Sequence, residues 1–378
     1  EAFGPYFTDR VQTPWGKAID YNLDPVREWV AQSAVGWVSD FGIDGLRLDA
    51  IHAIFDSSAE HIVQAVARRV HQLRQDVLVI AESGLNDPRV MRPVDRGYGC
   101  DGAWADDFHH ALRTLVTDER EGYYAEFGRV DQLGKALHRP HVHDGTYSSF
   151  RHRRFGAPAE DVPAERFVVF SQNHDQVGNR AMGDRMPAQA RSLAALCTLL
   201  SPFVPLLFMG EEYGETAPFQ FFSDHIDPEI AQATREGRRA EFSSFTAFSE
   251  EEVPDPQDPA TFERSKLTRQ GDLALEQLYR ELIDLRRQLG GAGDADWVMV
   301  DEGKRSLQFR RGAVDVVCNF DQSELTLPLA GQNVRLATAP QTRVDEASGA
   351  IVLAPLSGVV LERTRTPVRV AEASETSP

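Results

Sequence analysis

Cysteine is scarce in this 378-residue chain, which has only three, at positions 100, 197 and 318. An odd number of widely separated cysteines supports neither a disulfide framework nor a zinc-binding pattern. Cys197 in AALCTLL and Cys318 in VVCNF lie within apolar runs, so we expect both to be small buried residues. This cysteine usage favours the cytoplasm as the compartment.

Long apolar runs are also lacking, because no segment approaches the ~20 residues needed to span a bilayer. The first residues, EAFGPYFTDR, have neither the basic nor the apolar part of a secretory signal peptide. Positive charge is in deficit: the formal net charge of −18 repels nucleic acid and anionic lipid and favours a neutral or cationic ligand. The composition therefore predicts a soluble globular protein with no nucleic-acid partner and no membrane partner.

Apolar strands alternate with amphipathic helices between residues 24 and 290, which predicts a parallel sheet. A helix is expected to begin at Asp24, with Pro25 in its first turn, and to end at Gly42. Residues 1–23 are expected to form an irregular loop. Further helices are expected at 58–74, 190–200 and 272–289, and strands at 45–50, 77–83, 102–108, 166–175 and 204–212.

A glycine-rich segment at residues 290–296, GGAGDAD, predicts a linker, and the change of character beyond it predicts two domains followed by a tail. Residues 1–293 are expected to form a catalytic α/β part, residues 294–365 a small β-sandwich, and residues 366–378 a flexible tail. The α/β part supplies about five βα units, whereas a (β/α)₈ TIM barrel needs eight. We therefore expect the C-terminal part of a barrel, about strands 4–8, which is stable only beside a missing N-terminal portion.

Charged residues interrupt the strand GLRLDA, where Arg47 and Asp49 lie on the same face. A buried strand holds such charges only where they are paired or used. Other predicted strands also end in polar residues: Glu82, then Asp106, Asp107 and His109, then His174 and Asp175, then Glu211 and Glu212. The carboxyl ends of the strands of a barrel meet at one rim, and this rim holds the active site.

Carboxylates from three separate strand ends suit the cleavage of a glycosidic bond. One carboxyl group must protonate the leaving oxygen, and another must attack the anomeric carbon or assist a water that does. Arg47 would keep Asp49 ionised, while apolar walls near Glu82 would favour its protonated, acidic form.

Simpler interpretations exist for each of these residues alone. Arg47 and Asp49 could form a plain ion pair, and Glu82 could cap a helix or lie on the surface. The recurrence of such groups at three strand ends favours a catalytic role over these simpler interpretations. The histidines of HRPHVHDG, residues 138–145, lack a helical i, i+4 pair, so no metal and no cofactor are expected.

The motifs DGLRLDAIH, VIAES and SQNHDQVGNR resemble those of the α-amylase superfamily of glycoside hydrolases, where they lie on barrel strands four, five and seven. The resemblance implies that Asp49 is the nucleophile, Glu82 the acid/base and Asp175 the stabiliser of the transition state. It also implies a set of substrate-binding residues: Arg47, His52, Asp106, Asp107, His109, His110, His174, Gln176 and Asn179.

Within the superfamily, AESGLNDPR, DDFHHAL and FMGEEYGETAPFQFFSDH are similar to the maltooligosyltrehalose trehalohydrolase family, and the similarity runs from residue 1 to about 365. It implies retaining hydrolysis of the α-1,4 bond next to the terminal trehalose, which releases trehalose and a maltooligosaccharide. A maltooligosyltrehalose synthase would supply the substrate.

Two other functions remain open on the sequence. A glucan branching enzyme or another transglycosylase could use the same barrel, because the acceptor subsites that exclude water cannot be read from the residues. A non-catalytic carbohydrate-binding or scaffolding barrel usually lacks one of the three carboxylates, and this chain has all of them.

Overall fold

The structure, a computed structural model, describes residues 4–13, 16–242 and 253–363. The tail expected at 366–378 lies outside these residues. Within the described ranges, every helix is too short or too polar to cross a bilayer.

A parallel sheet of five strands forms the centre of the α/β part, in the order β3-β4-β5-β8-β9. Spatial order follows chain order, so each connection carries the chain to the neighbouring strand. The predicted parallel sheet is confirmed. Its strands are β3 (Gly45–Leu48), β4 (Leu78–Ala81), β5 (Gly102–Trp104), β8 (Phe167–Val169) and β9 (Val204–Pro205).

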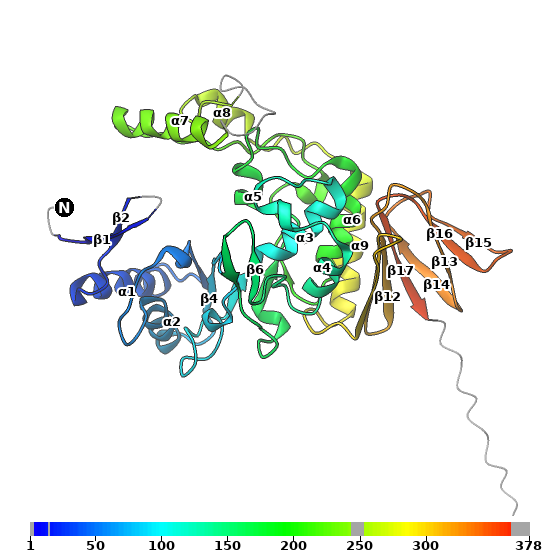
Figure 1. Ribbon diagram of the computed structural model, residues 1–378, viewed down its shortest axis with the longest axis horizontal. Helices are drawn as coiled ribbons and strands as arrows, with labels where there is room; N and C mark the ends of the chain where they lie inside the picture. Colours follow the sequence, from blue (N-terminus) through cyan, green and yellow to red (C-terminus); the bar gives the residue numbers. More distant parts are fainter. Residues whose placement is uncertain (1–3, 14–15, 243–252, 364–378) are drawn as a thin grey trace, which may run out of the picture.

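Helices flank this sheet where the apolar periodicity predicts them. In α2, Ile62, Val66 and Val70 recur on one buried face, and Asp272 accepts a hydrogen bond from the amide of Ala274 to begin α9. The α-helices (Figure 1) are α1 (Asp24–Ser39), α2 (Ile62–Leu73), α3 (Asp106–Thr117), α4 (Val130–Ala136), α5 (His174–Gly178), α6 (Ala188–Leu199), α7 (Pro228–Phe242), α8 (Pro259–Arg264) and α9 (Leu273–Gln288).

Short helical turns and hairpins complete the α/β part. The 3₁₀ turns are η1 (Ile51–Ala53), η2 (Pro88–Val90), η3 (Gly122–Glu126), η4 (Ala164–Arg166) and η5 (Glu211–Tyr213). The two antiparallel hairpins are β1 (Phe7–Thr13) with β2 (Gly16–Ile19), and β6 (Thr146–Ser148) with β7 (Arg153–Phe155).

Four expectations about these elements were wrong. The strands expected at 166–175 and 204–212 end at Val169 and Pro205, and α5 and η5 begin within those two segments. The segment 1–23 contains the β1–β2 hairpin instead of an irregular loop, and its aromatic, proline and glycine residues concealed the alternation of exposed and half-buried positions. The strand expected at 102–108 ends at Trp104, and α3 begins at Asp106. Two adjacent acidic residues are favourable in the first turn of a helix, which accounts for this early start.

Residues 297–363 form two antiparallel sheets (Figure 1). The first contains β10 (Trp297–Asp301), β11 (Ser306–Arg311), β12 (Val314–Asn319), β17 (Ser357–Arg363) and β14 (Gln332–Ala337), in that order. The second contains β13 (Leu325–Pro328), β16 (Ala350–Leu353) and β15 (Arg343–Asp345). A small apolar cluster that includes Val317 and Ile351 joins the two sheets.

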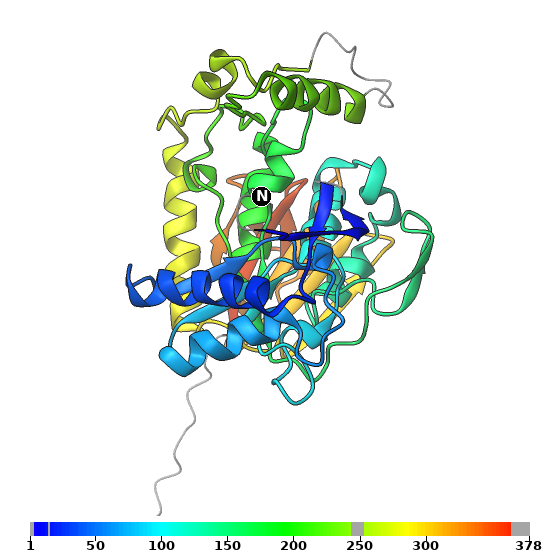
Figure 2. The same cartoon turned by 90° about the vertical axis from the view of Figure 1, so that its left-hand side faces the viewer.

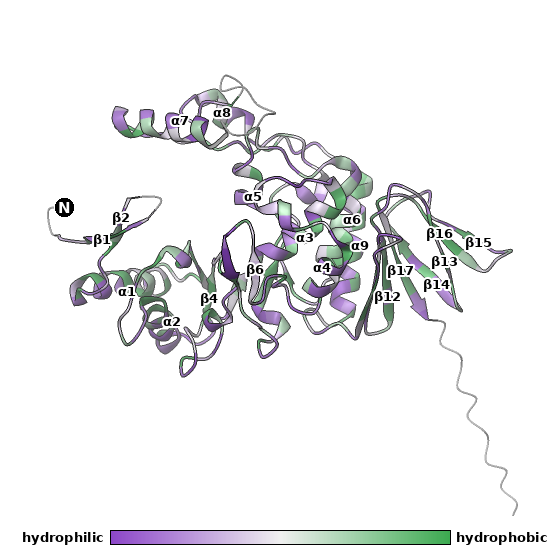
Figure 3. Ribbon diagram, viewed as in Figure 1, coloured by the Kyte–Doolittle hydropathy of each residue, from purple (hydrophilic) through white to green (hydrophobic). Residues whose placement is uncertain are grey.

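The main hydrophobic core does not stop at the segment 290–296, where a linker was expected. It runs from the parallel sheet through α6 and α9 and includes Leu307, Val316 and Val360 of the first C-terminal sheet. Green, hydrophobic stretches mark α6 and the strands β13 and β16 in Figure 3. The α/β part and the first C-terminal sheet therefore share one core, and the second sheet packs through the separate small cluster.

Candidate active site

Arg47, in β3, lies against carboxylates that come from three places in the sheet. Its guanidinium contacts Asp49, which directly follows β3, and lies 2.8 Å from Glu82 Oε2 and 3.9 Å from Asp175 Oδ2. Glu82 directly follows β4, and Asp175 lies in the first turn of α5, just after β8. One cation thus joins the carboxyl ends of β3, β4 and β8, which explains the charges in an otherwise apolar strand.

The backbone after β3 fixes the distance between Asp49 and Glu82. The Glu82 amide donates to Leu48 O at 2.9 Å, and the Ala50 amide donates to Glu82 Oε2 at 2.8 Å. Ala50 has φ 42°, a left-handed conformation that costs on the order of 1 kcal/mol for a residue with a side chain. This turn directs the Ala50 amide to Glu82 and leaves the Asp49 side chain 75% exposed.

Burial raises the pKa of Glu82 to about 7, and the Ala50 amide and Arg47 oppose this shift. The nearby negative charges of Asp175 and Asp49 raise it further. A carboxyl group with this pKa is partly protonated at neutral pH, which is the state that a general acid needs.

Two histidines lie at the edge of this cluster, as the sequence predicts. His52 is exposed, and its Nδ1 accepts a hydrogen bond from the Gly84 amide at 3.4 Å; burial of its ring lowers its pKa. His174 lies with Nε2 3.5 Å from Asp175 Oδ2, and its side chain is about half exposed. Both can face a ligand above the three carboxylates.

Asp106 and Gln176 lie near Asp175, which directly precedes Gln176 in α5. Gln176 Nε2 lies 3.5 Å from Asp106 Oδ1, which links α5 to the start of α3. Burial raises the pKa of Asp106, with the negative charge of Asp107 adding to the effect. Asn179 is exposed at the C-terminal end of α5.

The structure does not bring His109 to the rim. The ring is fully buried, with Nδ1 2.6 Å from Ser171 O and Nε2 2.8 Å from the hydroxyl of Tyr124. Burial holds its pKa well below the usual range, so the ring is neutral. His109 therefore supports the chain after β8 from below, and the expected contact with a sugar hydroxyl would require it to give up one of these partners.

Asp107 and His110 lie beneath the rim as well. Asp107 is 3% exposed and accepts hydrogen bonds from Asn86 Nδ2 at 2.7 Å and from the His143 amide at 2.9 Å. His110 is buried with Nδ1 3.7 Å from Asp107 Oδ1. The prediction placed these residues at a strand end; because α3 begins at Asp106, its first turns carry them into the interior instead.

Trp104, which the sequence analysis did not single out, completes the cluster. The Arg47 guanidinium stacks over its ring at 4.3 Å from the centroid, a cation–π contact, and the His174 ring meets it edge-on at 5.8 Å. Its position as the last residue of β5, beside the strand that ends at Glu82, was the available signal.

A pocket of about 310 Å³ opens beside Asp49. The β1–β2 hairpin supplies one wall, with Lys17 and Ile19, and the chain after β3 supplies the other, with Ala50 and Phe55. A space of this size on one side of the carboxylate suits a sugar residue.

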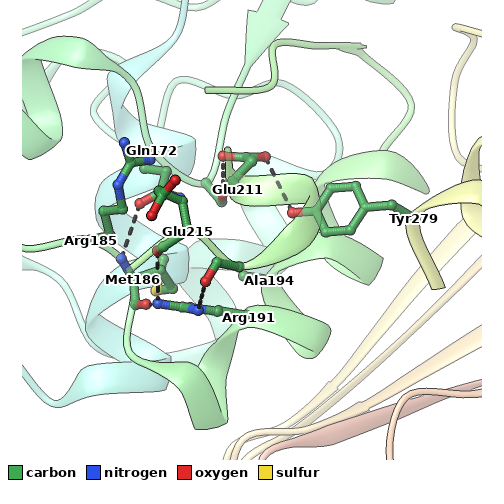
Figure 4. Close-up of a pocket in the computed structure, with 10 residues that line it drawn as sticks. Gln172, Arg185, Met186, Arg191, Ala194, Glu211, Glu215 and Tyr279 are labelled. Carbon is green, nitrogen blue, oxygen red and sulfur yellow. Dashed lines mark hydrogen bonds between the residues drawn. The ribbon is translucent and has the colours of Figure 1, made fainter. Parts of the chain in front are cut away.

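Glu211, which was expected at the rim, lies in a separate buried cluster (Figure 4). Its carboxyl oxygens accept from the hydroxyls of Tyr279 at 3.3 Å and Ser171 at 3.4 Å, and burial raises its pKa to about 7. Arg185 lies on the other side of this cluster and donates to the backbone oxygen of Met209 at 2.8 Å. These contacts secure Ser171, four residues before Asp175.

Comparison with known proteins shows that the chain is similar to malto-oligosyltrehalose trehalohydrolases. No family model matches the chain. The chain is 44% identical to the malto-oligosyltrehalose trehalohydrolase of Rhizobium sp. (strain M-11), over 95% of this chain and 64% of that protein. The enzymes of that name from Mycobacterium tuberculosis (strain H37Rv) and Saccharolobus solfataricus are 41% and 40% identical, over 89% and 87% of this chain and 62% and 58% of theirs.

Solved structures agree with this relationship. A putative alpha amylase from Salmonella typhimurium has a TM-score of 0.81 and 32% identity, over 95% of this chain and 64% of that one. The alpha-amylase from H. orenii has a TM-score of 0.59 at 17% identity, over 93% and 67%, a likeness of fold. The chain is thus related to malto-oligosyltrehalose trehalohydrolases and has the fold of α-amylase-family enzymes, and it spans a little under two thirds of these relatives' length.

Proposed function

We propose that this chain forms the catalytic part of a retaining glycoside hydrolase that acts on maltooligosyltrehalose. The enzyme cleaves the α-1,4-glucosidic bond next to the terminal trehalose and releases trehalose and a maltooligosaccharide. The observation that carries the proposal is the contact of one guanidinium, Arg47, with the carboxylates that follow three parallel strands. The name shared by the relatives supplies the substrate.

The proposed mechanism uses the three carboxylates in turn. Glu82, with its raised pKa, protonates the glycosidic oxygen while Asp49 attacks the anomeric carbon to form a glycosyl-enzyme. Glu82 then deprotonates the water that releases the sugar, and Asp175 stabilises positive charge on the ring in both transition states. These steps require no metal and no cofactor.

The sugar contacts follow from the exposure of the surrounding side chains. His52, His174 and Asn179 face solvent around the carboxylates and are proposed to bind hydroxyl groups directly. Asp107, His109 and His110 are proposed to position the site from beneath, because their polar atoms contact the protein.

For the fold, we propose that β3, β4, β5, β8 and β9 are strands 4–8 of a (β/α)₈ barrel within residues 1–293, and that residues 294–365 form a β-sandwich. The β3 and β9 edges would then pair with the remaining strands of the barrel. The three free, buried cysteines support a cytoplasmic location, where a maltooligosyltrehalose synthase would supply the substrate.

Product analysis tests this function. The complete natural protein is incubated with maltooligosyltrehalose and, separately, with a plain maltooligosaccharide, and the sugars are identified by chromatography and proton NMR. We expect free trehalose from the first substrate only, and an α-anomer at the newly formed reducing end. A product with new α-1,6 branches would identify a transglycosylase instead, and an initial β-anomer would exclude retention.

A further inference from the structure

The short helix α5 carries His174 and Asp175 and needs support at both of its ends. At its N-terminus, Asn173 Oδ1 accepts a hydrogen bond from the Gln176 amide at 2.8 Å. The carbonyl groups in the last turn of any helix lack partners within the helix. In a helix of only five residues, such end groups make up much of the structure, so outside donors decide how firmly it is held.

Arg238 supplies the donor at the C-terminal end. It lies on α7, in the long segment between β9 and α9, and its Nη2 donates to Gly178 O at 2.8 Å and to Arg180 O at 2.9 Å. Figure 1 shows α7 and α8 on the side of the molecule where α5 lies. Arg238 is only 7% exposed, although it belongs to a helix whose other side chains are mostly in solvent. A buried cation at the end of a helix is electrostatically favourable.

A second support reaches the same region from α3. Arg180, just beyond α5, pairs with Glu119 at 2.6 Å, and Glu119 also accepts from Arg113 at 2.8 Å. The pKa of Glu119 is lowered to about 2: its burial acts to raise it, but these two guanidiniums together outweigh that effect. Arg238 is therefore one of two supports at the C-terminal end of α5, and the Arg180–Glu119–Arg113 contacts do not depend on it.

We propose that Arg238 is a positioning residue for Asp175, so that the α7 segment takes part in the reaction although it contributes no group to the carboxylate cluster. The inference rests on the proposed function of Asp175. Asp175 Oδ2 lies 3.9 Å from Arg47, at the outer limit of an ion pair, so a small shift of α5 takes it out of position. Misplacement of about 1 Å in a catalytic group can cost about 10²-fold in rate.

Steady-state kinetics on the complete natural protein test this role. We expect Arg238→Met to lower kcat on maltooligosyltrehalose by about 10- to 100-fold with KM changed less than about threefold, because Asp175 acts in the transition state. Arg238→Lys keeps one donor and should recover part of the loss. The matched control is Arg235→Met on the same helix, which breaks the 3.0 Å pair with Asp255 and does not touch α5.

A second readout separates a role through Asp175 from a role through the acid Glu82. Arg238→Met should lose the same factor on an aryl glycoside with a good leaving group, because Asp175 acts whether or not the leaving oxygen needs a proton. Because Arg238→Met removes the donor to two carbonyl groups, its melting temperature is expected to fall, so kcat is measured per mole of folded protein.

The outcomes are distinguishable. If wild type and Arg235→Met release trehalose and Arg238→Met does so equally well, Arg238 has no positioning role and the proposed function stands. If Arg238→Met and Arg238→Lys lose activity only in proportion to a fall in folded protein, the role is structural and the inference fails. If wild type releases no trehalose from maltooligosyltrehalose, the proposed function itself fails.

Discussion

Arginine side chains at opposite ends of the molecule have different kinds of partner. At the end near α1, the Arg47 guanidinium faces the carboxylates of Asp49, Glu82 and Asp175. At the other end, where α6 and α9 meet the C-terminal sheets, Arg286 donates to the carbonyl oxygens of Leu199 and Ser201 at 2.8 Å each, and Arg311 donates to the same Ser201 oxygen. Figure 2 shows α1 in front and the C-terminal strands behind.

Packing differs between these ends in the same sense. At the end near α1, the helix and the turn after it expose large aromatic side chains: Trp29 at 53%, Trp37 at 50% and Phe41 at 70%. At the far end, the first C-terminal sheet packs so closely on α6 that a Cβ on Gly358 would lie 2.2 Å from Leu196 Cδ2, so a larger residue there would force Leu196 to move. At the far end, which we call the closed end, side chains pack tightly and buried carbonyl groups have hydrogen-bond donors. At the site end, which we call the open end, large side chains are exposed and charged groups lie close together.

The difference separates two uses of charge. Arg286 fills the hydrogen-bonding capacity of backbone groups that would otherwise be buried without partners, which stabilises the fold. Arg47 holds acidic groups close together where they repel one another and where Glu82 is driven towards its protonated form, which serves chemistry. We therefore expect substitutions at the two ends to have opposite effects on activity and stability.

The largest effect on activity is expected from Asp49→Asn. The amide keeps the shape of the carboxylate but cannot attack carbon, so kcat should fall about 10⁴-fold or more. Because the Asp49 side chain is 75% exposed, the free energy of unfolding should change by less than about 0.5 kcal/mol. Calorimetry and single-turnover kinetics check both; substantial residual turnover would assign the nucleophile elsewhere.

Glu82→Gln should lower kcat on the natural substrate by about 10²- to 10⁴-fold. Aryl glycosides with good leaving groups should retain most of their glycosylation rate, because they need no proton. An equal loss on both kinds of substrate would show that Glu82 is not the acid.

The pH profile of the wild-type enzyme gives an independent check on Glu82. Its pKa is raised to about 7, and the acid is active only while protonated. The kcat/KM should therefore fall as the pH rises through about 7, and this alkaline limb should disappear in Glu82→Gln. A rate that stays flat to pH 9 in the wild type would contradict the assignment.

At the closed end, Arg286→Met should lower stability and leave activity unchanged, the opposite of the effect expected for Asp49→Asn. Leu199 O and Phe203 O would lose their donor, while Ser201 O would keep a 2.7 Å hydrogen bond from Arg311. We expect a loss of about 2–4 kcal/mol in the free energy of unfolding with kcat unchanged within about twofold. Denaturant titration and kinetics measure the two quantities; a fall in kcat of tenfold in folded protein would mean that the ends are coupled.

The open end was the more predictable of the two from the sequence. Asp49, Glu82 and Asp175 each follow an apolar strand, and parallel strands bring such residues together whatever the details of packing. The prediction that failed at this end concerned the local orientation of one side chain. The burial of His109 depends on the residue at which α3 begins, and a strand expected to continue to 108 gives the opposite orientation.

The closed end was poorly predictable, because its contacts join residues far apart in the chain. A linker was expected at 290–296, yet the core continues across it, since glycine and acidic residues reveal a turn and not what packs on either side. Cys197 and Cys318 were correctly expected to be buried, but the contact of their sulfur atoms at 3.7 Å, across 121 residues, left no local pattern.

The smallest effect is expected from Cys197→Ala at this closed end. The thiol is 1% exposed and packs from α6 against Cys318 of β12, so removal of one sulfur leaves a small cavity where Gly358 already allows little adjustment. We expect a loss of about 1 kcal/mol, or about 1–2 °C in melting temperature, and no change in kcat or KM. Cys318→Ala should cost a similar amount, and the double variant should cost less than the sum, because both changes empty one shared space. Full additivity would mean that the two thiols do not share a cavity, and it would weaken the picture of a single closed core that joins α6 to the C-terminal sheet.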